Sequence, residues 1–150
     1  MLGTGAAAPT FTLSQLGGGE VSDPWRDGPL VLAFFKTSCP VCRMSAPMMQ
    51  AMAESGARVV AIGEDPPAEL EEFAGEEGLA VPILTEPVPY PVSDAYDLDT
   101  VPSLFLVDRD GTVLDTTVSW DRVGWNRLST AAGGAEVSHD GDGRPPQRPG

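Results

Sequence analysis

The chain contains two cysteines, Cys39 and Cys42, which are separated only by Pro40 and Val41. Cys39 follows the apolar run Leu30–Phe35 and directly precedes a helix that is predicted to begin at Pro40. The exposed amides and the dipole at the start of a helix favour negative charge, so the Cys39 thiol is expected to ionise more readily than a free thiol. Because the thiolate is the attacking species in thiol–disulfide exchange, the sequence predicts that Cys39 is a nucleophile.

Cys42 lies three residues after Cys39, nearly one helical turn away. From that position its thiol can attack a mixed disulfide on Cys39 and release the bound substrate. The cysteine pair then carries the electrons itself, so the reaction needs no organic cofactor. We therefore predict that Cys39 attacks and Cys42 resolves.

A pair of purely structural cysteines and a metal site are the alternatives for this motif. A zinc site needs four protein ligands, or three and a water molecule, and the chain has no other cysteine. Its one histidine, His139, falls in a segment that is predicted to be disordered. No metal is therefore expected.

The elements that must position the cysteines follow from the apolar pattern. Alternating strands and helices come first and a strand hairpin comes later, an order that predicts an α/β fold with a central mixed sheet flanked by helices. Pro82 breaks one of the predicted strands or moves it to the sheet edge. Strands are predicted over 11–14, 20–22, 30–35, 58–62, 79–84, 103–107 and 112–118, and helices over 40–55, 67–77, 93–96 and from 121, the last carrying Val123, Trp125 and Leu128.

Length and composition predict one domain over residues 1–132 and a disordered tail over 133–150, where the chain becomes polar and rich in glycine and proline. The formal net charge of −13 disfavours nucleic acids and anionic membrane surfaces as partners. Part of this charge lies in Glu64–Glu77, which holds seven acidic residues and no basic one. That stretch is interpreted as a solvated helix face, with a docking face for a basic partner as the alternative.

No apolar run is long enough to cross a bilayer. The first residues, 1–9, lack the basic start and the apolar core of a secretory signal. The sequence as written therefore predicts a cytoplasmic protein, with an extracytoplasmic one as the alternative if a signal or anchor has been removed.

Two motifs resemble the thioredoxin-like superfamily. The segment Cys39–Pro47 is similar to the active-site helix of thioredoxins, including a proline five residues after the second cysteine. The segment Val101–Val107 resembles their cis-proline loop and the strand that follows. The N-terminal hairpin and the insert Glu64–Asp99 look more like the TlpA/ResA type of extracytoplasmic reductase and the peroxiredoxins, which are related to AhpC/TSA. The resemblance covers roughly residues 8–132.

This resemblance implies a thioredoxin fold with an N-terminal β-hairpin and an insert before the cis-proline strand. It implies that Pro102 is cis and packs beside Cys39, and that the backbone of Val101 pairs with a bound substrate strand. Pro40 and Pro47 are implied as supporting residues of the site. The implied function is a protein thiol–disulfide oxidoreductase, with protein thiols or disulfides and a further redox protein as partners. A reductase is favoured over an oxidant because the sequence as written lacks a signal peptide and cytosolic thiols are kept reduced.

The sequence also departs from the thioredoxin pattern. Ala33 stands where thioredoxins carry a buried aspartate, and Ser38 replaces the tryptophan before the first cysteine. Proton transfer at Cys42 must therefore come from water or from the carboxylates of Glu64 and Asp65, which are otherwise interpreted as part of a solvated loop.

Peroxide reduction is disfavoured by a direct check of the motif. The reactive cysteine of peroxiredoxins follows a proline and a threonine at set distances, and this chain has Leu32 and Lys36 at those places. A non-catalytic binding module, for a protein partner or a soft metal, remains the alternative function. The intact cysteine motif favours the oxidoreductase.

Overall fold

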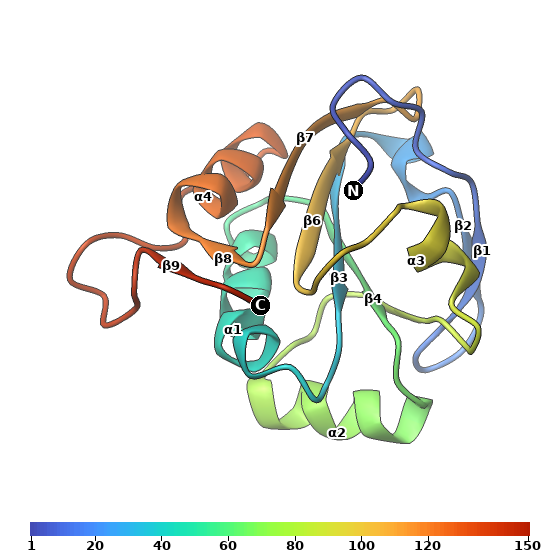
Figure 1. Cartoon of the computed structure of the whole chain (residues 1–150), viewed down its shortest axis with the longest axis horizontal. Helices are drawn as coiled ribbons and strands as arrows, with labels where there is room; N and C mark the ends of the chain where they lie inside the picture. The colour runs from blue at the N-terminus through green and yellow to red at the C-terminus, as the bar shows by residue number, and fades with distance from the viewer.

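A seven-stranded mixed sheet forms the centre of the structure, a computed structural model that describes residues 1–150 (Figure 1). The chain contains the strands β1 (Thr12–Gln15), β2 (Glu20–Ser22), β3 (Leu30–Phe35), β4 (Val59–Gly63), β5 (Ile83–Thr85), β6 (Ser103–Val107), β7 (Val113–Val118), β8 (Trp120–Asp121) and β9 (Gln147–Arg148). The helices are α1 (Pro40–Glu54), α2 (Pro67–Glu77), α3 (Pro91–Ala95) and α4 (Arg122–Ala131), with a 3-10 turn η1 at Pro24–Asp27. The strand order in the sheet is β2-β1-β5-β4-β3-β6-β7, while β8 and β9 form a separate pair.

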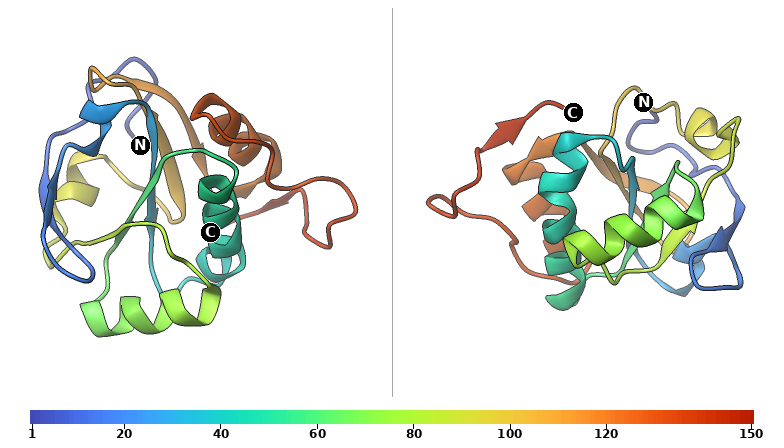
Figure 2. Two further views of the ribbon diagram at one scale, coloured as in Figure 1. Left: turned by 180° about the vertical axis from the view of Figure 1, so that it is seen from behind. Right: turned by 90° about the horizontal axis from the view of Figure 1, so that it is seen from below.

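Strand β3 lies in the interior of the sheet, parallel to β4 and antiparallel to β6. All six of its residues are buried, as expected for a continuous apolar run between two covered faces. Alternate β3 residues point to opposite sides, so Ala33 contacts the core under α1, α2 and α4, and Phe34 contacts the core under α3. Figure 2 shows α1 and α4 on one side of the sheet and α3 on the other. This sandwich fixes the end of β3, from which the chain enters α1.

The predicted mixed sheet and its flanking helices are confirmed, with local differences. The strand expected over 79–84 contains only Ile83–Thr85, because the residues up to Pro82 are irregular. Strand β5 lies between β1 and β4, so the prediction of an edge position is wrong and that of a broken strand is right. In α4, Trp125 is buried as expected, whereas Val123 is 70% exposed.

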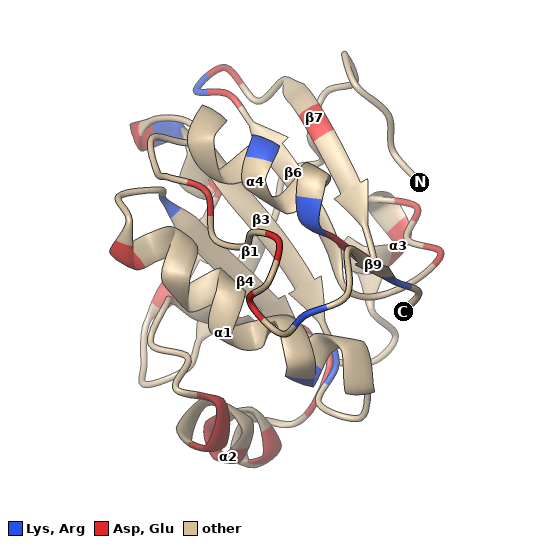
Figure 3. Cartoon of the chain, turned by 90° about the vertical axis from the view of Figure 1, so that its left-hand side faces the viewer, with Lys and Arg blue, Asp and Glu red and all other residues tan.

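The outer face of α2 is strongly acidic (Figure 3). Leu70 and Phe73 are its buried residues and anchor it to the core, while most of its glutamates are exposed. This arrangement fits the interpretation of a solvated helix face. No helix of the chain has the length and apolar character needed to span a membrane.

Residues 133–150 leave α4, turn back, and end in β9, which pairs with β8. The guanidinium of Arg122, at the start of α4, donates hydrogen bonds to Ser138, Asp140, Asp142 and the Arg144 carbonyl. The disorder that the sequence predicts for this segment stays a prediction. If the segment is ordered in solution, these Arg122 hydrogen bonds hold it against α4.

Candidate active site

Cys39 lies at the junction of β3 and α1, where it is the N-cap residue of the helix. Its backbone is extended, and its Sγ accepts a hydrogen bond from the Cys42 amide at 3.1 Å. Pro40 occupies the first turn of the helix, a position that suits proline because the amide there has no partner within the helix. The start of the helix therefore directs the Cys42 amide and the positive end of the helix dipole at the sulfur.

The two thiols differ sharply in their surroundings. Cys39 is half-buried and reachable from solvent, whereas Cys42 is fully buried in the core under α1. Burial, and then the hydrogen bond with Cys39, raises the pKa of the Cys42 thiol well above its ordinary value. Cys42 is therefore protonated and shielded at neutral pH, while Cys39 can meet another molecule.

The loop before β6 completes the site beside Cys39. The Val101–Pro102 peptide bond is cis, as the resemblance implied. The Cys39 thiol donates a hydrogen bond to the Val101 carbonyl over 3.5 Å between sulfur and oxygen, which links residues 62 positions apart. No protein group accepts the Val101 amide hydrogen. The structure thus brings Cys39, Cys42, Val101 and Pro102 together at one end of the sheet.

Pro47 lies further along α1 and is half-buried, and the helix continues through it to Glu54. The neighbouring methionines Met48, Met49 and Met52 are buried in the core, so their helical spacing reflects packing. Met44 is partly buried against the same core.

Sequence reasoning missed the role of Arg43, which follows Cys42. Its guanidinium pairs with Glu76 at 2.7 Å and with Glu77 at 3.2 Å, and it stacks over Phe73 with 4.9 Å to the ring centroid. It also donates to the Thr37 carbonyl. Arg43 therefore ties the start of α1 and the loop before Cys39 to α2. A basic residue next to the motif, opposite a predicted acidic helix, was the available signal.

The prediction of a solvated loop is wrong for Glu64, whose side chain is only 8% exposed. Its carboxylate lies 3.6 Å from Lys36 Nζ and accepts a hydrogen bond from Ser93. Burial raises the pKa of Glu64, and the charge of Lys36 offsets part of that effect. Asp65 instead accepts the Thr37 amide at 2.7 Å and so supports the loop before Cys39. Neither carboxylate hydrogen-bonds to Cys42.

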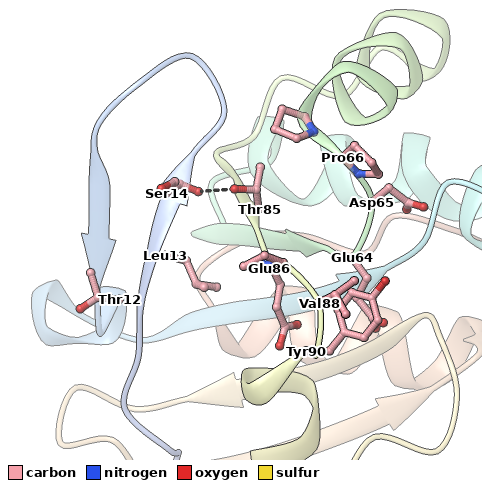
Figure 4. Close-up of a pocket in the computed structure, with 12 residues that line it drawn as sticks. Thr12, Leu13, Ser14, Glu64, Asp65, Pro66, Thr85, Glu86, Val88 and Tyr90 are labelled. Atoms are coloured by element: carbon pink, nitrogen blue, oxygen red, sulfur yellow. Dashed lines mark hydrogen bonds between the residues drawn. The ribbon is translucent and has the colours of Figure 1, made fainter.

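Two adjoining hollows lie near the cis-proline loop, and the smaller one begins beside it. The smaller is lined by Val101, Lys36 and Glu64, and the larger extends from Glu64 and Tyr90 towards β1. Figure 4 shows the larger one, about 600 Å³ in volume, with Glu64, Val88 and Tyr90 close together. Glu64 and Tyr90 line both hollows, so a molecule bound at Val101 can extend along the same surface.

Comparison with known proteins identifies the family to which this chain belongs. The profile of the AhpC/TSA family matches residues 4–116. The chain belongs to the AhpC/TSA family. Among the relatives of this chain, the thiol-disulfide oxidoreductase ResA of Geobacillus kaustophilus is 32% identical over 116 residues, which are 73% of this chain and 66% of that protein. The match therefore spans slightly less than two thirds of the relative's length.

Solved structures show that this family member has the thioredoxin fold. The thioredoxin domain of a thiol-disulfide oxidoreductase from Bacteroides vulgatus superposes with a TM-score of 0.75 at 18% identity, covering 88% of this chain and 99% of that one. A secreted disulfide oxidoreductase of Mycobacterium tuberculosis, described as homologous to Escherichia coli DsbE, gives a TM-score of 0.67 at 23% identity, with 81% and 95% coverage. The predicted fold class and its TlpA/ResA-like character are confirmed.

Proposed function

We propose that this chain is a protein thiol–disulfide oxidoreductase in which Cys39 is the attacking residue and Cys42 the resolving residue. One observation carries the proposal: a solvent-reachable Cys39 Sγ caps α1 and accepts the Cys42 amide, while the Cys42 thiol behind it is buried. The ResA relative and the family match support the same activity.

The proposed exchange proceeds in two balanced steps. The Cys39 thiolate attacks one sulfur of a substrate disulfide, the substrate S–S bond breaks, and the departing substrate thiolate takes up a proton. Cys42 then loses its proton and attacks the sulfur of Cys39 in the mixed disulfide, which releases the second substrate thiolate. The pair is left as a Cys39–Cys42 disulfide, and two electrons have passed to the substrate. A further thiol protein must reduce the pair again.

The substrate is proposed to bind as an extended segment along the Val101–Pro102 loop. The Val101 amide has no protein acceptor, so it can donate to a passing strand, and the Val101 carbonyl accepts the Cys39 thiol beside it. Pro40 and Pro47 are proposed to support the site through the shape of α1.

The proposed direction is reduction of the substrate. A strongly oxidising pair has a reduced form in which the thiolate is stabilised by several donors or by cations. Here Cys39 Sγ accepts its hydrogen bond from the Cys42 amide, and no lysine, arginine or histidine side chain donates to it. The residues between the cysteines, Pro40 and Val41, bring no charge either.

We propose an extracytoplasmic location rather than the cytoplasmic one that the sequence as written predicts. The Mycobacterium tuberculosis structure is described as that of a secreted protein, and it shares this fold. Cell fractionation followed by detection of the native protein tests the location directly.

The experiment that tests the function combines two cysteine variants with a redox titration. Cys39→Ser is expected to abolish reduction of a protein disulfide, whereas Cys42→Ser should accumulate a mixed disulfide that is visible by mass spectrometry. The chain has no other cysteine, so every adduct identifies its position. Turnover by Cys42→Ser at the parent rate would contradict the assignment of roles.

The reduction potential of the pair is measured by equilibration in glutathione or dithiothreitol buffers and alkylation of the free thiols. A value near about −270 mV supports a reductase, and one near about −120 mV indicates an oxidant. A pair that forms no disulfide at any potential would overturn the exchange proposal and favour a binding module.

A further inference from the structure

We propose that residues 145–150 of the chain occupy the site for substrate peptides beside Val101 and compete with protein substrates for it. This inference rests on the proposed function, because it concerns the same peptide-binding loop. The marked C-terminal end lies near the start of α1 in two different views of the molecule (Figures 1 and 2).

Hydrogen bonds to the backbone of this segment hold it as an added strand. Trp120 Nε1 donates to the Pro145 carbonyl at 2.7 Å, and the Arg122 amide donates to the Pro146 carbonyl at 2.9 Å. Gln147 and Arg148 then pair with β8 in antiparallel register. An extended peptide added to an exposed strand edge is a common mode of peptide recognition.

The end of the segment reaches the cis-proline loop itself. The Gly150 amide donates to Ser119 Oγ at 2.9 Å, and the Ser119 amide donates to the Pro102 carbonyl at 2.7 Å. A Cβ added to Gly150 would overlap the carbonyl oxygen of Val101. That oxygen also accepts the Cys39 thiol. The segment therefore reaches the Val101 carbonyl that faces the attacking sulfur, while it leaves the Val101 amide unpaired.

The chemistry of the segment suits a displaceable occupant. It contains no cysteine, so Cys39 cannot attack it. Its residues are exposed, and hydrogen bonds rather than buried apolar side chains hold it in place. A substrate strand that supplies equivalent backbone bonds can replace it at little cost in buried surface. If the segment leaves the site free in only a fraction of the molecules, the apparent affinity of the protein for its substrate falls in proportion to that fraction.

The test uses single substitutions in the full-length chain. Gly150→Val places a side chain against the Val101 carbonyl and should expel the end of the segment. We expect it to raise kcat/KM for reduction of insulin by about three- to tenfold, through KM, if the occupied form predominates. Reduction of oxidised glutathione, which is too small to need the whole groove, should change by less than about twofold. The matched control Gln147→Val alters an exposed side chain of the same segment and should behave as the parent.

A second measurement adds a synthetic peptide of residues 144–150 to the Gly150→Val variant. Competitive inhibition of insulin reduction by this peptide, with no inhibition by the same peptide carrying valine at its last position, supports the proposal. Equal activity of the parent and the Gly150→Val variant, or no inhibition by the peptide, would overturn it while leaving the exchange function intact. Absence of exchange by the parent and all variants would overturn the proposed function and this inference with it.

Discussion

Substitution of Arg122 tests whether the segment after α4 packs on the domain. The Arg122 residue is only 9% exposed, and its guanidinium bonds to the Ser138 hydroxyl at 3.0 Å and to the Arg144 carbonyl at 2.8 Å, besides two carboxylates. Hydrogen bonds to a charged group contribute about 1.5–3 kcal/mol each, and bonds that share one group do not add fully. Arg122→Ala should therefore lower the free energy of unfolding by about 2–4 kcal/mol.

Arg127, on the same helix, provides a matched control. It forms an ion pair with Asp115 through two nitrogens, but its side chain is 49% exposed and that of Asp115 is 28% exposed. Solvent screening reduces the contribution of such a pair, so Arg127→Ala should cost less than about 1 kcal/mol. The two variants remove the same side chain from one helix and differ in the burial of its partners.

The assay is urea unfolding followed by tryptophan fluorescence, to which the three buried tryptophans, Trp25, Trp120 and Trp125, contribute. With a slope of about 2 kcal/mol/M, the expected loss for Arg122→Ala shifts the midpoint by roughly 1–2 M, and Arg127→Ala shifts it by less than about 0.5 M. Equal shifts for the two variants would refute the packing argument. Residues 133–150 would then behave as the disordered tail that the sequence predicts.

Three further predictions follow from burial and space. In the reduced protein at pH 8, iodoacetamide should modify Cys39 at least about tenfold faster than Cys42, because the raised pKa of Cys42 keeps it protonated where a free thiol ionises; tryptic mass spectrometry measures both rates, and equal rates would contradict the assignment. Burial raises the pKa of Glu64, so its charged form destabilises the folded state once pH rises through that pKa. Glu64→Gln should consequently have a higher Tm than the parent at pH 7, with the gain lost below about pH 4.3, the ordinary value for glutamate; a gain that is independent of pH would contradict this. Finally, a Cβ at Gly124 would overlap a side chain of β7, whereas one at Gly75 meets open space in a helix. Gly124→Ala should destabilise by about 1–3 kcal/mol and Gly75→Ala should stabilise by about 0.5–1 kcal/mol, and urea unfolding that gave the opposite order would contradict the packing described.

The sequence predicted the parts of the site that depend on neighbours in the chain. The run from Leu30 to Phe35 is apolar at every position, which a strand buried on both faces requires, and a proline after Cys39 suits the first turn of a helix. The unequal roles proposed for the cysteines rest on these two elements. The strand at 79–84 was less predictable, because Pro82 ends the irregular part and only three residues then pair with β1 and β4.

The surroundings of Glu64 could not be predicted in the same way. Its position after a strand and its charge are typical of a solvated loop, but Ser93 and Lys36, which come from other parts of the chain, enclose it. The acidic neighbour Glu86, also bound to Ser93, adds to the rise in its pKa. The burial of Glu64 therefore depends on two loops and on α3 together, and no local pattern encodes it.

The contact between Gly150 and Val101 shows most clearly why the site needed a structure. The two residues are 49 positions apart, and each belongs to a stretch that the sequence describes well by itself: a cis-proline motif and a segment rich in proline and glycine. Proline cannot donate a backbone hydrogen bond, so Pro145, Pro146 and Pro149 predict poor strand formation. Proline still has a carbonyl that can accept a hydrogen bond. Trp120 and Arg122 donate to the carbonyls of Pro145 and Pro146, and so hold the segment in spite of its missing amide donors. Under the proposed competition, the same feature would make the segment a weak occupant: it accepts hydrogen bonds but donates few, whereas a substrate strand with ordinary residues can do both.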